Sequence, residues 1–172
     1  RLALPLESQP AESDCGVALL AALCSYWGVA LPPEKRADLV RRAQASDGLS
    51  GAELCATLTE LSFEVSLFHG SLDRSSTGLL AHVDARRPLL VMSSADREHR
   101  HYGLVIGYDE AREALLMLDP EQGEVSLAFT SFVRDWARCQ HFTLLACRAE
   151  TAAIARAGTE PPPRLATTTP AE

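Results

Sequence analysis

Residues 14–28 read DCGVALLAALCSYWG, an almost continuous apolar segment between an aspartate and a glycine. Asp14 is a favourable N-cap residue for a helix, and Gly28 is a typical helix stop. Because apolar residues occur on every side between Cys15 and Trp27, a helix formed by this segment must be buried nearly all round. We therefore predict a helix that the rest of the fold encloses.

Local signals predict two more helices in the first half of the chain. Pro33 suits the first turn of a charged helix that runs to about Ala43. Ser50 and Glu53 have the spacing of a capping box, which predicts a helix ending near Leu61. The other elements predicted in this half are a strand over residues 63–68 and a short helix over residues 77–85.

The second half of the chain is predicted to form strands. The turn-forming residues 109–112 separate two apolar runs, which is typical of a hairpin. The predicted strands cover residues 88–92, 101–108, 113–119, 124–128 and 141–147, and a short helix covers residues 129–137. Helices followed by antiparallel strands indicate the α+β class.

The C-terminal segment differs from the rest in composition. Residues 148–172 contain four of the ten prolines, together with a run of threonines, and no aromatic residue. Such a segment cannot bury enough apolar area to offset the entropy of the chain. We therefore expect one folded domain over residues 1–147 and a disordered tail over residues 148–172.

The charge and hydropathy of the chain exclude two classes of partner. Lys and Arg number 16 against 23 Asp and Glu, so the net charge is −7 and no basic excess exists to neutralise nucleic-acid phosphates. The longest apolar stretch, residues 16–24, is about half of what a membrane span needs. We expect neither nucleic-acid binding nor a membrane span.

The five cysteines show neither an even count nor the paired spacing of metal ligands. Free thiols of this kind indicate a reducing compartment, which points to a cytoplasmic location. The histidines also lack paired ligand spacing, and no glycine-rich phosphate loop is present. We therefore expect no metal and no cofactor.

Cys15 is the cysteine best placed for chemistry. It stands in the first turn of the predicted helix, where free N–H groups and the helix dipole favour a thiolate. Gly16 would let the backbone and a substrate approach each other closely. The alternative is a small buried hydrophobic residue, which is the usual role of a free cysteine. We assign that structural role to Cys24, Cys55, Cys139 and Cys147.

The predicted hairpin brings a histidine towards a carboxylate. If its loop centres on Glu110, His101 and Asp119 stand directly opposite each other and share one face of the sheet. A loop centred between Glu110 and Ala111 would instead place Pro120 opposite His101. The alternative for His101 is an ordinary surface or hydrogen-bonded histidine.

Residues 9–18, QPAESDCGVA, resemble the active-site motif of the papain-like bacteriocin-processing peptidases, which cleave after double-glycine leaders. In that motif a Gln lies six residues before the Cys of Asp-Cys-Gly, as Gln9 does before Cys15. The second half of the motif, a His-aromatic strand followed by Asp-Pro, Gly and an aromatic segment, is matched by His101-Tyr102, Asp119-Pro120, Gly123, Phe132 and Trp136.

The resemblance, which covers about residues 4–147, implies a papain-like fold and a peptide or protein substrate. It implies that Cys15 is the nucleophile, His101 the base and later the acid, and Asp119 the residue that orients His101. Gln9 would complete an oxyanion hole with the Cys15 backbone N–H, and a carboxamide is a suitable neutral donor for that purpose. Without the motif, Gln9 would be a solvated loop residue. Gly103 departs from the family, which usually has a β-branched residue there, and is expected to loosen the strand beside His101.

Members of this family are often fused to a membrane transporter and an ATPase. The sequence shows neither a membrane span nor a Walker loop. It is therefore expected to be a freestanding member or an excised domain, and the implied partner is a membrane exporter encoded separately.

Two other functions use the same residues. A papain-like acyltransferase or amidase would employ the same triad with a different acceptor. A non-catalytic peptide-binding module would keep the fold without the chemistry, but the presence of Cys15, His101, Asp119 and Gln9 together favours catalysis. A cysteine peptidase that cleaves after a small residue is the function the sequence favours.

Overall fold

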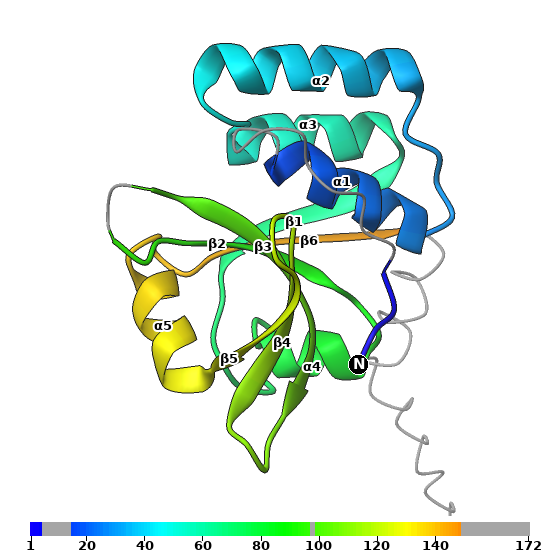
Figure 1. The fold of residues 1–172 in the computed structure, drawn as a ribbon. Coiled ribbons are helices and arrows are strands. Elements are labelled where there is room, and N and C mark those ends of the chain that lie inside the picture. Colours follow the sequence, from blue (N-terminus) through cyan, green and yellow to red (C-terminus); the bar gives the residue numbers. More distant parts are fainter. Residues whose placement is uncertain (5–14, 97–98, 149–172) are drawn as a thin grey trace, which may run out of the picture.

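The computed structural model describes residues 1–4, 15–96 and 99–148 (Figure 1). The helices are α1 (Cys15–Tyr26), α2 (Pro33–Ser46), α3 (Gly51–Glu60), α4 (Leu79–Asp84) and α5 (Phe129–Ala137). The strands are β1 (Phe63–His69), β2 (Leu89–Ser93), β3 (His101–Asp109), β4 (Ala114–Asp119), β5 (Gly123–Ala128) and β6 (Phe142–Arg148). The predicted α+β class is confirmed.

The predicted elements are all present, and their bounds differ mainly where the backbone turns. The capping box of Ser50 and Glu53 is formed, whereas α2 continues beyond the predicted end to Ser46. Glu113 and His141 were predicted as strand residues, but they adopt φ values of 48° and 54°, so each belongs to the turn before its strand.

The strands form one antiparallel sheet in the order β1-β6-β2-β3-β4-β5. The last strand therefore lies inside the sheet, between β1 and β2. Helices α1, α2 and α3 gather on one face of this sheet, while α4 and α5 pack on the other (Figure 1). The result is a three-layer arrangement with a separate core on each side of the sheet.

Alternation along the central strands divides the two cores. In β2, Leu90 faces the core of α1–α3, whereas Leu89 and Val91 face the core of α4 and α5. The α1 helix is buried over most of its length, as predicted, with Leu19, Leu20 and Leu23 fully inaccessible.

The register predicted for the β3–β4 hairpin is wrong. Next to the turn, Asp109 pairs with Ala114. An irregularity between Val105 and Gly107 then shifts the register by one residue, so that Leu104 stands opposite Leu118. The carbonyl of Ile106, inside this irregularity, accepts a hydrogen bond from the Leu2 N–H at 2.7 Å. The error in the predicted register arises at the turn, because Asp109 pairs with Ala114 instead of Ala111 and Glu113, with its φ of 48°, belongs to the turn.

The end of the folded part lies close to the predicted boundary. Arg148, assigned to the tail from the sequence, is the last residue of β6 and pairs with Phe63. The rest of the predicted tail, residues 149–172, lies outside the described residues. Among the residues that are described, no helix has the length and apolar character needed to cross a membrane.

Candidate active site

Cys15 is the first residue of α1, at the edge of the helical core. Only 7% of its surface is exposed, and it lines a groove between the helices and the sheet. The first turn of a helix has backbone N–H groups without helical partners, and these favour negative charge. Asp14, the predicted cap, and Gln9, the predicted oxyanion donor, lie outside the described residues.

His101 is the first residue of β3 and faces both Cys15 and Asp119. Its Nε2 lies 2.9 Å from Asp119 Oδ2, and this contact is an ion pair rather than a well-aligned hydrogen bond. Cys15 is also close enough to influence the protonation of the ring. The structure thus brings together Cys15, His101 and Asp119, which come from α1, β3 and the end of β4.

The wrong register leaves this contact intact because of a diagonal arrangement. Extending the observed pairing by one residue from Leu104–Leu118 puts Gly103, not His101, opposite Asp119. His101 is therefore a diagonal neighbour of Asp119, and such neighbours remain within reach of long side chains. The residues predicted to meet do meet, but by a different geometry.

The surroundings of His101 favour its charged form. Asp119 is the largest influence and Cys15 the next, and together they outweigh burial and raise the pKa of His101 to about 10. The ring is therefore an imidazolium at neutral pH. An imidazolium beside a thiol at a helix start is the environment that stabilises a thiolate.

Asp119 is itself oriented by the turn that follows it. Its Oδ1 accepts the backbone N–H groups of Glu121 at 2.8 Å and Gln122 at 2.9 Å, which leaves Oδ2 to face His101. Burial raises the pKa of Asp119, but His101 and these two N–H groups outweigh it and hold the pKa below its usual value. The carboxylate is thus both ionised and fixed in direction.

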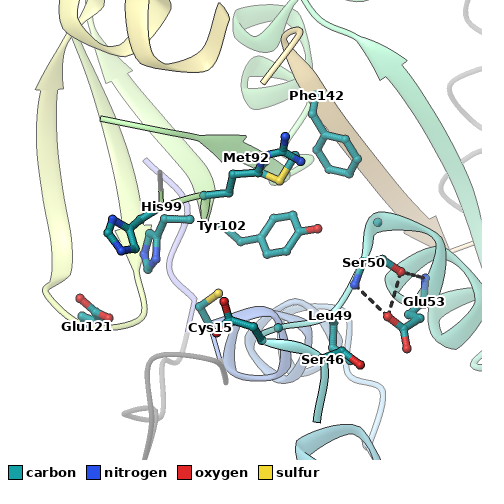
Figure 2. A pocket seen from close by; sticks show the side chains of 15 residues that line it. Cys15, Ser46, Leu49, Ser50, Glu53, Met92, His99, Tyr102, Glu121 and Phe142 are labelled. Atoms are coloured by element: carbon teal, nitrogen blue, oxygen red, sulfur yellow. Dashed lines mark hydrogen bonds between the residues drawn. The ribbon is translucent and has the colours of Figure 1, made fainter. Parts of the chain in front are cut away.

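A groove of about 710 Å³ opens beside these residues (Figure 2). One wall is the segment from the end of α2 to the start of α3, and the other comes from the sheet and its loops. The lining residues are Cys15, Ser46, Asp47, Gly48, Leu49, Ser50, Gly51, Glu53, Met92, His99, Arg100, His101, Tyr102, Glu121 and Phe142. The groove is thus long enough to reach from the His101 side of Cys15 to the loop after α2.

Aromatic packing closes the groove on the side of the sheet. The rings of Tyr102 and Phe142 have centroids 6.0 Å apart, and burial raises the pKa of Tyr102 to about 12. A Cβ at Gly51 would lie 2.7 Å from the Phe142 ring, so α3 can approach β6 this closely only because residue 51 has no side chain.

Two glycine expectations need correction. A Cβ at Gly16 would meet Leu49, Leu54 and Tyr102 at ordinary contact distances of 3.5–3.7 Å, so Gly16 faces the core rather than a substrate. Gly103 does not leave a loose strand, because the Met117 Cε lies 2.7 Å from where its Cβ would be and occupies that space.

The other cysteines have the structural role predicted for them. All five cysteines are free, and Cys24, Cys139 and Cys147 are buried, with Cys55 half-buried. Burial raises the pKa of Cys24 to about 11, and it also raises the pKa of Cys55, Cys139 and Cys147. Thiols in such surroundings stay protonated and unreactive.

Sequence reasoning missed most of the groove wall. The backbone of Glu121 and Gln122, which fixes Asp119, was detectable only as a turn after Asp-Pro. The wall after α2 was visible in part through its capping box, whereas no local signal marked Met92 or Phe142, because strand order brings them there. Within residues 1–4, 15–96 and 99–148, no group of three or more His, Cys, Asp or Glu side chains could hold a metal ion.

Comparison with known proteins gives a consistent result. The model of the Peptidase C39 family matches residues 3–149. The lactococcin-G-processing and transport ATP-binding protein LagD of Lactococcus lactis subsp. lactis is 23% identical over 128 residues, which is 74% of this chain. The chain spans only 17% of the length of LagD.

Solved structures show the same fold. One is a double-glycine-motif protease from an AMS/PCAT transporter in complex with the leader peptide (TM-score 0.65, 18% identity, 85% of this chain and 92% of the other). Another is the peptidase domain of Streptococcus ComA, a bifunctional ABC transporter (TM-score 0.67, 19% identity, 83% of this chain and 97% of the other). At these identities the likeness bears on the fold alone, and it confirms the predicted papain-like architecture.

Proposed function

This chain belongs to the Peptidase C39 family of cysteine peptidases, and on that premise we propose that Cys15 is its nucleophile, His101 its acid–base residue and Asp119 the orienter of His101. The observation that carries the assignment is the 2.9 Å contact between His101 Nε2 and Asp119 Oδ2, on a histidine that lines the same groove as Cys15. These are the residues that a thiol nucleophile requires: a base within reach, and a third group that holds the base.

The proposed reaction proceeds through a thioester. The Cys15 thiolate attacks the carbonyl carbon of the cleaved bond, and the His101 imidazolium gives its proton to the leaving amine. His101, now neutral, takes a proton from water, and the resulting hydroxide attacks the thioester. The leader carboxylate and the Cys15 thiolate are released, and His101 is again an imidazolium.

Gln9 is proposed to donate its side-chain N–H to the tetrahedral oxyanion, together with the Cys15 backbone N–H. This assignment rests on the spacing of Gln9 and Cys15 in the sequence. Removal of one such donor costs about 10²–10³ in rate.

The proposed substrate is a peptide with a double-glycine leader, cleaved after the second glycine. The relatives support this choice, since one is named for lactococcin G processing and another was solved with its leader peptide bound. A groove that extends from Cys15 along the α2–α3 wall offers room for the residues before the cleaved bond. Because LagD is named a processing and transport protein and ComA is an ABC transporter, we further propose a membrane exporter as the partner.

We also propose that the protein acts in the cytoplasm. Five free cysteines, most of them buried, suit a reducing compartment.

The test uses synthetic peptides that carry Gly-Gly before the cleavage point. The wild-type chain is expected to cut after the second glycine, and mass spectrometry of the products identifies the bond. A matched peptide with Gly-Gly replaced by Val-Val should remain intact. If neither peptide is cleaved, the proposal is contradicted. If the acyl group is transferred to an added amine in preference to water, the acyltransferase alternative is favoured.

A further inference from the structure

The wall of the groove after α2 is built from a short segment with fixed ends. At its start, Asp47 and Gly48 adopt φ values of 54° and 111°, and the Gly48 N–H donates to the Ala43 carbonyl at 2.7 Å. A φ of this size suits glycine, so the chain leaves α2 in a defined direction. Residues 46–51 then line the groove continuously.

The other end of this segment is held by the capping box of α3. Glu53 Oε2 accepts from the Ser50 N–H at 2.9 Å and from the Ser50 hydroxyl at 2.8 Å. In return, the Glu53 N–H donates to Ser50 Oγ at 3.3 Å. Both residues line the groove, so the Glu53 carboxylate determines where this part of the wall stands.

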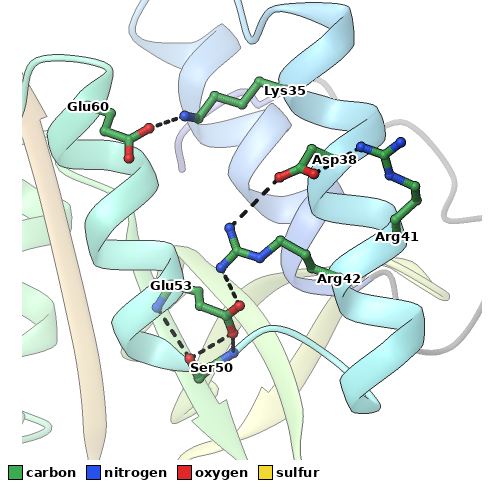
Figure 3. Close-up of polar contacts among 7 residues, drawn as sticks. All are labelled: Lys35, Asp38, Arg41, Arg42, Ser50, Glu53 and Glu60. Carbon is green, nitrogen blue, oxygen red and sulfur yellow. Dashed lines mark hydrogen bonds and ion pairs between the residues drawn. The ribbon is translucent and has the colours of Figure 1, made fainter.

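The second oxygen of that carboxylate is engaged from α2. Arg42 donates to Glu53 Oε1, and its other nitrogen lies 4.0 Å from Asp38 (Figure 3). Hydrogen bonds from Ser50 and then from Arg42 lower the pKa of Glu53, so its carboxylate is ionised at neutral pH. Arg42 therefore links the two helices across the segment that they enclose.

We propose that Arg42, through Glu53, is a positioning residue that holds residues 46–51 in the place where the substrate binds. The inference rests on the proposed function, because it assumes that the peptide occupies this groove. Arg42 has no place in the chemistry, since it contacts the wall from outside and is absent from the residues that line the groove.

The neighbouring Arg41 provides a matched control. It is on the same helix and forms an ion pair with Asp38 at 3.0 Å (Figure 3). Its side chain is more exposed, 75% against 47% for Arg42. Arg41→Met and Arg42→Met therefore remove the same charge from the same helix, but only the second frees Glu53.

The experiment measures cleavage of the Gly-Gly peptide by the full chain and by three variants. Arg42→Met is expected to raise KM about two- to fivefold with kcat within about twofold, since a partly exposed ion pair is modest in strength. Arg42→Lys, which keeps a cation, should restore most of the affinity. Arg41→Met should match the wild type. Equal KM values for Arg41→Met and Arg42→Met, or a fall in kcat alone, would overturn the inference.

Two further measurements test the inference if Arg42→Met does not fold or if no substrate is cleaved. If Arg42→Met does not fold, Glu53→Gln retains a capping-box residue while removing the charge that Arg42 needs, and it should raise KM to the same extent. Hydrogen exchange needs no substrate: a peptide spanning residues 46–54 should exchange severalfold faster in Arg42→Met than in Arg41→Met. If the wild type cleaves nothing, the proposed function fails, and equal exchange in the two variants would separately reject the role of Arg42.

Discussion

Helices α1–α3 and the sheet with its loops each carry one side of the groove, but they are held by different kinds of interaction. The helices are bounded by local devices, such as the Ser50–Glu53 capping box and the left-handed residues after α2. The strands depend on contacts between distant parts of the chain, including the Leu2–Ile106 hydrogen bond at the bulge. Cys15 is thus placed by local structure, whereas His101 and Asp119 are placed by the assembled sheet.

This difference predicts which changes affect the chemical step, which affect its pH dependence and which affect stability without changing kcat. Changes at the nucleophile should abolish the reaction without altering the structure of either wall of the groove. Changes at Asp119 should alter the rate and its pH dependence together. Changes at the contact between α3 and β6, or at the Ser50 hydroxyl of the α3 cap, should lower the free energy of unfolding and leave kcat unchanged.

The largest effect is expected from Cys15→Ala. Loss of the nucleophile should lower kcat for the Gly-Gly peptide by at least about 10⁴-fold, because the remaining groups cannot form a thioester. The melting temperature should stay within a few degrees of the wild type. Cys24→Ala is the control: this thiol is fully buried and outside the site, so activity should persist while stability falls. Full activity in Cys15→Ala would refute the assignment.

The next largest effect is expected from Asp119→Ala, which removes the orienter and the acceptor of two turn N–H groups. A fall in kcat of about 10²-fold or more is expected, by analogy with other catalytic triads that lose their carboxylate. Asp119 is the main reason that the pKa of His101 is raised to about 10. Without it, the imidazolium is lost at lower pH, so the alkaline limb of the kcat/KM profile should move to lower pH.

The same substitution should change the pH dependence of stability. In the wild type, His101 stays protonated after folding at pH values where the unfolded chain, with a pKa near 6.5, has lost the proton. Its contribution is therefore complete below that value and is lost as the pH rises through about 10. Urea unfolding at pH 7 and pH 10 should show a smaller difference in Asp119→Ala than in the wild type. An unchanged difference would exclude His101 as its source.

A pair of glycine substitutions tests the contact between the two sides. Gly51→Ala places a Cβ 2.7 Å from the Phe142 ring and should reduce the free energy of unfolding by about 1–3 kcal/mol. Gly16→Ala, whose Cβ would have no neighbour nearer than 3.5 Å, should be neutral or stabilising by up to about 1 kcal/mol, since alanine favours a helix. Chemical denaturation measures both, and equal effects would mean that Phe142 moves aside freely.

The smallest effect is expected from Ser50→Ala. Loss of the hydroxyl that accepts the Glu53 N–H should reduce the free energy of unfolding by about 1 kcal/mol and the melting temperature by about 2–4 °C. Ser126→Ala, an exposed position on β5, should change the free energy by no more than about 0.5 kcal/mol. Similar shifts in the two variants would show that the cap does not stabilise α3.

The sequence predicted the local structure well and the long-range structure in part. Gly28 predicted where α1 ends, and the capping box predicted where α3 begins, because helix caps involve residues close in sequence. The hairpin was predicted correctly, but the predicted register was wrong, since the turn extends to Glu113 and Asp109 pairs with Ala114. The contact of His101 with Asp119 was predicted from direct opposition, and it forms despite the wrong register because the two residues are diagonal neighbours. Phe142 entered the groove through the placement of β6 between β1 and β2, which no local pattern encodes.

The central claim is that a cysteine placed by a helix and a histidine placed by a sheet act as one unit. It is tested most directly by alkylation of Cys15 with iodoacetamide at pH 6, with peptide mapping to separate Cys15 from the other four cysteines. If the His101 imidazolium stabilises the thiolate, Cys15 in the wild type should react at least about tenfold faster than in His101→Ala. Equal rates in the two proteins would contradict the claim.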